Sequence, residues 1–201
     1  MPNASTDAHS TYQRLIERVE TFAQAIHQRY PTQLTCHAGC DGCCYQTFTI
    51  FPLEAHHMAH TVAALDAKQR DGLRQAMHQV SQPLSIAEEP QPCVLLDHDG
   101  RCRLYDGRPL ICRMQGYPLF SDMIERPDGG KRDCCPLNFT DTPLAEIDPD
   151  TIFNLDLVNQ TLAAINHLFV EAQGETGERV SIRQAVLQAL DAVESPRGES
   201  L

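Results

Sequence analysis

The stretch C-H-A-G-C-D-G-C-C, from Cys36 to Cys44, places four cysteines within nine residues. Such a density of thiols is typical of a disulfide framework, a redox-active thiol pair, or a soft metal held by thiolates. Gly39 and Gly42 lie between the cysteines and allow tight turns, in which backbone N–H groups face the sulfur atoms. The stretch therefore favours a metal centre built on irregular backbone, with the rest of the chain arranged around it.

Length and composition limit what the chain can be. Its 201 residues are enough for one core, so we expect a single domain over residues 1–201. The net charge is −11, whereas proteins that bind nucleic acid usually carry a basic surface. We therefore do not expect nucleic acid as a partner. Neither a signal sequence nor a run of about 18 apolar residues is visible, so we expect no membrane association and a cytoplasmic location. In that reducing compartment, cysteine clusters bind metals more often than they form disulfides.

Helical patterns flank the cysteine-rich region, which spans residues 36–135. Apolar residues recur at spacings of three and four over residues 8–30, which predicts an amphipathic helix. Pro52 begins a second predicted helix, and Asp66 caps a third. Two C-terminal helices are predicted within residues 149–194, over about 149–172 and 179–194. The predicted fold is mainly α, with helices packed around a cysteine-rich irregular metal-binding region.

A small β-hairpin is predicted inside this region. Val94–Leu96 and Arg101–Tyr105 flank D-H-D-G, whose residues favour a tight turn. A hairpin of this kind would bring Cys93 and Cys102, one on each arm, towards each other. A short helical turn carrying Cys112 is predicted to follow. The hairpin therefore offers metal ligands some fifty positions after the opening stretch.

The distribution of cysteines indicates a dedicated site. Cysteines used only as small apolar residues should also occur on the apolar faces of the flanking helices, and none does. Nearby arginines would offset thiolate charge and lower thiol pKa values; they are Arg101, Arg103, Arg108 and Arg113. The predicted metal ligands are drawn from all nine cysteines: Cys36, Cys40, Cys43, Cys44, Cys93, Cys102, Cys112, Cys134 and Cys135.

Cysteine spacing favours a [4Fe–4S] cluster over Zn²⁺. The C-x3-C-x2-C spacing of Cys36, Cys40 and Cys43 resembles the loops that wrap iron–sulfur sites, whereas zinc modules typically use two separated C-x2-C pairs. Four thiolates complete either centre, so nine cysteines permit one site with spare thiols or two sites. The alternative function is a structural or storage zinc protein without redox chemistry. A radical S-adenosylmethionine enzyme has the same spacing, but the chain has too few predicted strands for its barrel.

Five short motifs resemble the CxxCxxCC cysteine-cluster family of zinc- or iron-chelating domains, also called YkgJ-like. The motifs are G-C-D-G-C-C at Gly39–Cys44, P-L-E-A at Pro52–Ala55, P-C-V-L-L-D at Pro92–Asp97, G-R-C-R-L-Y at Gly100–Tyr105 and R-P-L-I-C-R at Arg108–Arg113. The first gap of this chain, after Cys36, has three residues where the name of the family implies two. The resemblance points most directly to five ligands: Cys43, Cys44, Cys93, Cys102 and Cys112.

The resemblance implies a metal-binding domain without naming a reaction. A related cysteine cluster in flagellin lysine N-methylases is associated with an iron–sulfur centre, so a methylase-related enzyme is the least favoured alternative. The expected function is a cysteine-ligated centre for electron transfer, sensing or structural support. Its expected partners are the metal or cluster and a redox protein. The sequence identifies no catalytic residue and predicts no cofactor beyond the bound metal or cluster.

Overall fold

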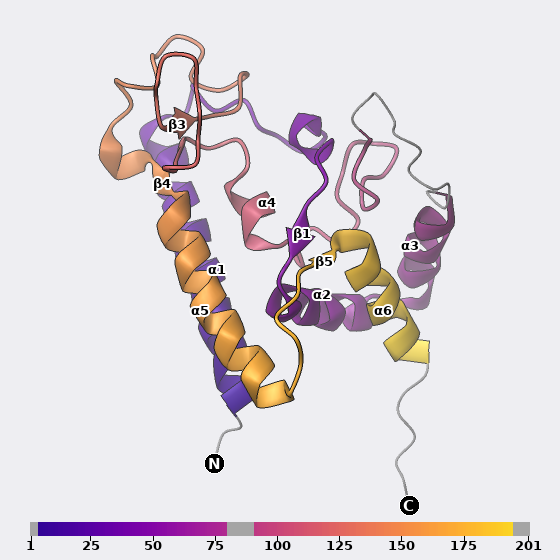
Figure 1. Ribbon diagram of the computed structural model, residues 1–201. Coiled ribbons are helices and arrows are strands. Elements are labelled where there is room, and N and C mark those ends of the chain that lie inside the picture. Colours follow the sequence, from indigo (N-terminus) through magenta and orange to yellow (C-terminus); the bar gives the residue numbers. More distant parts are fainter. Residues whose placement is uncertain (1–3, 80–90, 195–201) are drawn as a thin grey trace, which may run out of the picture. The chain divides into compact units, whose positions relative to one another are not determined.

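The computed structural model describes residues 4–79 and 91–194 (Figure 1). The chain divides into two compact units. Unit 1 comprises Met1–His37 and Leu110–Glu175, and unit 2 comprises Ala38–Pro109 and Thr176–Leu201. The described residues contain six α-helices and short strands, which confirms the mainly α fold class. The expectation of a single domain stays a prediction.

Unit 1 is built on two long helices, α1 (Ala4–Arg29) and α5 (Leu155–Gln173), which lie side by side (Figure 1). The buried side of α1 carries Tyr12, Ile16, Val19, Ala23 and Ile26, at the three- and four-residue spacing of one helix face. The remaining elements of this unit are α4 (Leu110–Met114), β2 (Leu119–Phe120), β3 (Arg132–Asp133), η2 (Pro149–Thr151) and β4 (Phe153–Asn154). The strands form a sheet in the order β3-β2-β4, with β3 antiparallel and β4 parallel to β2.

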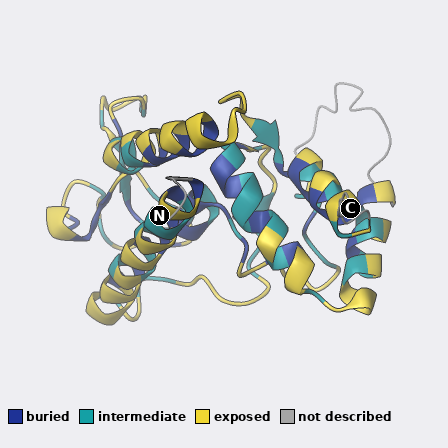
Figure 2. Cartoon of the chain, turned by 90° about the horizontal axis from the view of Figure 1, so that it is seen from below, coloured by how far each residue is buried: buried dark blue, intermediate teal, exposed yellow. Residues whose placement is uncertain are grey.

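Unit 2 contains α2 (Pro52–Ala64), α3 (Ala67–Gln79) and α6 (Ile182–Glu194). Its strands β1 (Thr49–Ile50) and β5 (Val180–Ser181) pair antiparallel, and they bring α6 against α2. The core of this unit is apolar and fully buried at its centre; it includes Ile50, Met58, Val62, Leu73, Met77, Val186 and Leu190. Figure 2 shows helices with buried and exposed sides, as expected for packing through one face.

Most predicted helices are confirmed, with shifted ends. The N-terminal helix, expected over 8–30, is α1 and begins four residues earlier, at Ala4. The helix expected from about 149 begins only at Leu155, where the Asn154 side chain accepts a hydrogen bond from the N–H of Leu157 (2.9 Å). Residues 149–154 instead form η2 and β4, so the predicted start of this helix is wrong. The physical reason is that the N–H of Phe153 donates to the carbonyl of Pro118 (2.9 Å), which ties this segment to β2.

The predicted hairpin is present as a bridge between two residues. Leu96 and Cys102 form an isolated antiparallel bridge around the D-H-D-G turn, and no longer strands flank it in the described residues. The stretch over residues 81–92 is rich in Pro, Gln and Glu, which predicts a connecting loop, and most of it lies outside the described residues. Among the described helices, none is both long and apolar enough to cross a membrane.

Candidate metal centre

The nine cysteines, all of which lie among the described residues, divide between the two units, and none is in a disulfide. The unit 2 cysteine group consists of Cys40, Cys43, Cys44, Cys93 and Cys102. The unit 1 cysteine group consists of Cys36, Cys112, Cys134 and Cys135. The boundary between the units follows His37. The nine-residue stretch that the sequence presents as one cluster is therefore split, with Cys36 in one unit and its other three cysteines in the other.

In unit 2, a short helical turn positions the adjacent pair Cys43 and Cys44. Both belong to η1 (Gly42–Cys44), and the N–H of Cys44 donates to the carbonyl of Asp41 (2.7 Å). The N–H of Cys93 in turn donates to the carbonyl of Cys44 (2.7 Å). This hydrogen bond joins two segments that are 49 positions apart, and it brings a third cysteine to the adjacent pair.

Cys102 reaches the same group through the bridged turn. The N–H of Asp97 donates to Arg101 and the N–H of Arg103 donates to Leu95, both at 2.8 Å. The side chain of Asp97 also accepts from the backbone N–H of Asp99 (2.9 Å) and Arg101 (2.8 Å), which closes the turn. The turn holds Cys102 opposite Leu96, three residues after Cys93, so both hairpin cysteines lie in one small loop.

Two glycines let this turn lie against the opening stretch. Gly100 has φ +72°, and a Cβ there would lie 2.9 Å from the carbonyl oxygen of Gly39. Gly39 has φ +92°, and its own Cβ would lie 3.3 Å from the carbonyl oxygen of Asp99. Any larger residue at these positions would strain the left-handed backbone and push the turn away from the cysteine stretch.

The thiols of the unit 2 group act on one another electrostatically. A hydrogen bond from the Cys44 thiol, helped by the charge of Arg108, lowers the pKa of Cys43 to about 6 against the opposing effect of burial. That same hydrogen bond raises the pKa of Cys44, and burial and the charges of Cys43, Cys93 and Cys102 raise it further. Burial is also the main cause that raises the pKa values of Cys93 and Cys102. The four thiols therefore lie close enough to interact, and the lowered pKa of Cys43 favours its thiolate form at neutral pH.

In unit 1, Cys36 and Cys134 lie against Gly116. The Sγ of Cys134 donates to the Gly116 carbonyl (3.3 Å), and the Nδ2 of Asn138 donates to the same carbonyl (2.7 Å) and to the Sγ of Cys36 (3.3 Å). Asn138 is only 4% exposed, and its Oδ1 accepts from the N–H (2.8 Å) and hydroxyl (3.0 Å) of Thr35. One buried amide thus connects the segment before Cys36 with the segment that carries Cys134.

The electrostatic setting of Cys134 differs from that of Cys43. Burial raises the pKa of Cys134 to about 12, and the negative charges of Cys135, Asp133 and Cys36 act in the same direction. A thiol in this setting stays protonated at neutral pH unless a cation compensates its charge. The interaction also shows that Cys36, Cys134 and Cys135 lie near one another.

The donor atoms in both groups fit zinc or iron. Thiolates are soft ligands that select zinc, copper(I) and iron–sulfur clusters. Among the described side chains, no three His, Cys, Asp or Glu are arranged as ligands of one metal ion. Rotation about the Cα–Cβ bond moves a thiol sulfur without moving the backbone, so a bound metal would require the thiols to adopt other rotamers than those described.

Arg108 and Arg113, two of the arginines expected to offset thiolate charge, interact with different partners. The charge of Arg108 lowers the pKa values of Cys43 and Cys102, as expected. Arg113, in contrast, is buried in unit 1 and forms an ion pair with Glu20 of α1. Its charge is compensated within the helical scaffold, because α4 packs against α1.

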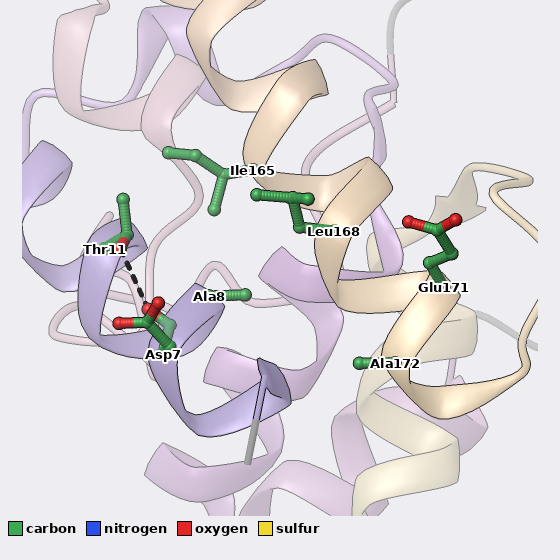
Figure 3. Close-up of a pocket in the computed structure, with 7 residues that line it drawn as sticks. All are labelled: Asp7, Ala8, Thr11, Ile165, Leu168, Glu171 and Ala172. Atoms are coloured by element: carbon green, nitrogen blue, oxygen red, sulfur yellow. Dashed lines mark hydrogen bonds between the residues drawn. The ribbon is translucent and has the colours of Figure 1, made fainter. Parts of the chain in front are cut away.

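The pocket in Figure 3 lies toward the N-terminal end of α1. It has a volume of about 380 Å³ between α1 and α5 and is lined by Asp7, Ala8, Thr11, Ile165, Leu168, Glu171 and Ala172. Thr11 lies near the N-terminal end of α1, whereas Cys36 follows the C-terminal end, about 27 Å of helix further on. The lining contains no cysteine or histidine, so this pocket offers no soft ligand.

Sequence reasoning missed two residues of the site, Gly116 and Asn138. Gly116 is the more detectable of the two, because a glycine four residues after Cys112 is a signal for a turn near a ligand. No sequence signal marks Asn138, which lies 102 positions after Cys36.

The comparisons agree with the chemistry of the cysteines. A family model named CxxCxxCC, with the description "Putative zinc- or iron-chelating domain", matches residues 35–136, about half of the chain. This range includes all nine cysteines. No curated protein and no solved structure matches the chain.

Proposed function

Because the chain belongs to the CxxCxxCC family, we propose that its unit 2 cysteine group binds a metal through thiolates and that the bound centre is a [4Fe–4S] cluster. The observation that carries this proposal is the meeting of Cys43, Cys44, Cys93 and Cys102 from three segments. The N–H of Cys93 binds the carbonyl of Cys44, and the thiols of Cys43, Cys93 and Cys102 all act on that of Cys44. Four thiolates are the ligand set of a [4Fe–4S] cluster.

The arrangement of these four cysteines favours a cluster over a single zinc ion. Zinc modules commonly hold the metal between two C-x2-C pairs. Here Cys43 and Cys44 are adjacent, and Cys93 and Cys102 lie on the two arms of a turn, so the four ligands do not form two such pairs. A cluster distributes its thiolates over four iron atoms, which suits ligands from three segments. Cys40 is the remaining thiol of this unit and is spare in the proposed ligand set.

Charge supports thiolate ligation at this place. Four thiolates are more negative than either a zinc ion or a typical cluster can neutralise. The positive charge of Arg108 lowers the pKa values of two of the four thiols, Cys43 and Cys102. The bound centre would serve electron transfer with a redox protein partner, sensing, or support of the fold.

A zinc-binding protein without redox chemistry is the alternative, and the family description includes it. An enzyme that depends on S-adenosylmethionine or is related to methylases is a further alternative with less support. The radical type would need a barrel of alternating strands and helices, whereas each described strand is two residues long and the described sheets have two and three strands.

The test is an anaerobic purification of the full chain, followed by measurement of iron, acid-labile sulfide, zinc and the visible spectrum. We expect about four iron atoms and four sulfides per cluster and a brown protein. A colourless protein with stoichiometric zinc and no sulfide would establish the zinc alternative.

Two matched variants test the ligand set. Cys102→Ser should lose the cluster of unit 2, whereas Cys40→Ser, the same change at the spare thiol, should keep it. Full metal content in Cys102→Ser would show that the proposed ligand set is wrong.

A further inference from the structure

A second set of thiols lies in unit 1, outside the proposed cluster. From its geometry we propose that Cys36, Cys112, Cys134 and Cys135 form a second metal site, which takes a thiolate-binding ion or cluster of zinc or iron. This inference rests on the proposed function, because it extends thiolate ligation to a second place in the same chain. Under this proposal the cysteines supply two metal centres, one in each unit, instead of a single centre drawn from all nine.

Gly116 is the point around which this second site is built. A Cβ at Gly116 would lie 2.9 Å from the Sγ of Cys36, and its carbonyl accepts a hydrogen bond from the Sγ of Cys134. Two sulfurs that are 98 positions apart in the sequence therefore contact the same residue. Gly116 has φ +91°, a left-handed conformation that glycine adopts without strain. The backbone is thus shaped to admit sulfur atoms at this point.

Asn138 holds the two sulfur-bearing segments together. Its Nδ2 contacts both the Cys36 sulfur and the Gly116 carbonyl, while Thr35 fixes its Oδ1. Groups that hydrogen-bond a metal ligand from outside commonly orient that ligand. A buried amide with donors aimed at a sulfur and acceptors fixed elsewhere matches this role. We assign Asn138 as a positioning residue of the second site.

The backbone beside Asn138 is strained. Phe139 has φ +51°, an uncommon value for a residue other than glycine. Its N–H donates to the carbonyl of Gln33 (2.9 Å), and its ring packs edge-on against Tyr30 at 5.1 Å between centroids. These contacts hold the strained residue beside the segment that leads to Cys36. Strain of this kind occurs preferentially at functional sites.

Unit 1 has enough thiols for a complete site. Cys134 and Cys135 are adjacent, and the charges of Cys135 and Cys36 act on Cys134. Cys112 lies on α4, four residues before Gly116, and is the proposed fourth ligand. Four soft donors complete the coordination of zinc or of an iron–sulfur cluster. Unit 1 could therefore bind metal without any ligand from unit 2.

Metal analysis of single and double variants of the full chain tests the two-centre arrangement. We expect Cys134→Ser and Cys102→Ser each to lose part of the metal, with losses that add up to the wild-type content in the double variant. A complete loss in Cys134→Ser, or no loss, would overturn the second site while leaving the proposed function intact. A wild-type chain without metal would instead refute the proposed function.

Asn138→Asp tests the positioning role. The new carboxylate keeps an acceptor for Thr35 but replaces the donor to the Cys36 sulfur with a negatively charged oxygen. In a Cys102→Ser background, we expect the remaining metal to bind about 10–100-fold more weakly in competition with a chelator. Asn154→Ala is the control, because it removes the cap of α5 in the same unit without touching a thiol. Equal metal affinity in both variants would overturn the role of Asn138.

Thiol labelling provides a test that does not depend on a variant folding. In metal-loaded wild-type protein, iodoacetamide should leave Cys36 and Cys135 unmodified, and removal of metal with a chelator should expose them; Cys134 is left out of this readout because its raised pKa slows its labelling in the metal-free protein as well. Identical labelling of these thiols before and after chelation would overturn the second site. A disulfide within the group in the freshly purified protein would do the same.

Discussion

In unit 2, the Cys43 thiol accepts a hydrogen bond from Cys44 and lies near the positive charge of Arg108, whereas in unit 1 the Cys134 thiol is shielded from solvent by burial and lies near the negative charges of Cys135 and Asp133. The first setting lowers a thiol pKa to about 6 and the second raises one to about 12. Cysteines that the sequence presents as equivalent are therefore chemically different. The comparison teaches that the burial and the partners of each thiol, rather than the number of thiols, decide which cysteines are thiolates at neutral pH.

The two groups also differ in what holds them together. In unit 2 the connections are backbone hydrogen bonds, from Cys93 to Cys44 and across the bridged turn at Cys102. In unit 1 the described connections centre on the buried side chain of Asn138, with a further hydrogen bond from the Cys134 thiol to the Gly116 carbonyl. A substitution at one residue should therefore disrupt the unit 1 group more easily than the unit 2 group.

The largest effect is expected from Leu190→Ala in the core of unit 2. Leu190 is fully buried on α6, so its truncation should lower the free energy of unfolding by about 2–5 kcal/mol. Chemical denaturation measures the loss, and hydrogen exchange locates it. The predicted single domain requires that α1 and α5 of unit 1 lose protection as well.

Leu157→Ala is the matched control for this prediction, because Leu157 of α5 is 61% exposed and its truncation should change stability by no more than about 0.5 kcal/mol. A loss of protection confined to α2, α3 and α6 after Leu190→Ala would contradict the single domain and show that the units unfold separately.

The next largest effect is a difference in thiol reactivity. In metal-free protein at pH 7, Cys43 should be alkylated on the order of 100-fold faster than Cys134, since the thiolate fraction differs more than the intrinsic nucleophilicity. Because the pKa of Cys43 is lowered to about 6, its labelling should slow as the pH falls through that value. The pKa of Cys134, raised to about 12, predicts slow labelling throughout the neutral range. Pulse alkylation with peptide mass spectrometry measures both rates.

Arg108→Gln sharpens the same measurement. Loss of the positive charge should raise the pKa of Cys43, so its labelling at pH 6 should slow while that of Cys134 in unit 1 stays the same. Equal rates at Cys43 and Cys134 in the unaltered chain would remove the electrostatic contrast between the groups.

A smaller effect is expected from a pair of glycine substitutions. Gly100→Ala and Gly116→Ala each place a side chain on a left-handed backbone, at a cost of about 1–2 kcal/mol. The new Cβ meets the Gly39 carbonyl in unit 2, which cannot rotate away, but meets the Cys36 sulfur in unit 1, which can. Gly100→Ala should therefore lose more stability. Gly116→Ala should instead weaken metal binding by unit 1.

Denaturation and metal analysis of these two variants separate the effects. Gly129→Ala is the control for strain alone, because Gly129 also has a positive φ and a Cβ there would meet nothing within 4 Å. If Gly116→Ala and Gly129→Ala bind metal equally, the contact between Gly116 and Cys36 has no role in ligation.

The smallest effect is expected from two exposed aspartates. Backbone hydrogen bonds, chiefly from the N–H of Arg101, lower the pKa of Asp97 in unit 2, and a hydrogen bond from the Ser121 hydroxyl (2.6 Å) lowers the pKa of Asp156 in unit 1. A lowered pKa contributes stability above the ordinary aspartate pKa of about 4, and this contribution is lost as the pH falls through the folded-state pKa. Asp97→Asn and Asp156→Asn should each flatten the fall in melting temperature between about pH 5 and pH 2. An unchanged pH profile in both variants would contradict this account.

Local sequence patterns predicted where helices occur better than they predicted the residues at which the helices begin and end. The apolar face of α1, from Tyr12 to Ile26, follows directly from residue spacing, and Pro52 marks the start of α2. The start of α5 could not be read in the same way, because two capping residues compete. Asp148 accepts a hydrogen bond from the N–H of Asp150 (2.9 Å) and caps η2, whereas Asn154 caps the helix. The pairing of β4 with β2, a contact between distant segments, decides between them.

The candidate site was likewise predictable only where its contacts join residues that are close in the sequence. The turn chemistry of D-H-D-G predicted that Cys93 and Cys102 approach each other, because that contact depends on nearby residues. The assignment of Cys36 and Cys40 to different units was not predictable from their three intervening residues. The contacts of Cys36 include Gly116 and Asn138, and the sequence contains no pattern that joins residues so far apart.

The sequence by itself determined the helical scaffold, the soft-donor chemistry of the nine cysteines and the membership of the CxxCxxCC family. Those properties depend on residue type and short spacing, which a linear chain displays directly. Only the tertiary structure decided which thiols are neighbours, which of them lies beside Arg108 and how far each is buried. The reason is that thiol proximity and pKa depend on hydrogen bonds and charges brought together by chain folding, such as the bond from Cys93 to Cys44 and the one from Asn138 to Cys36.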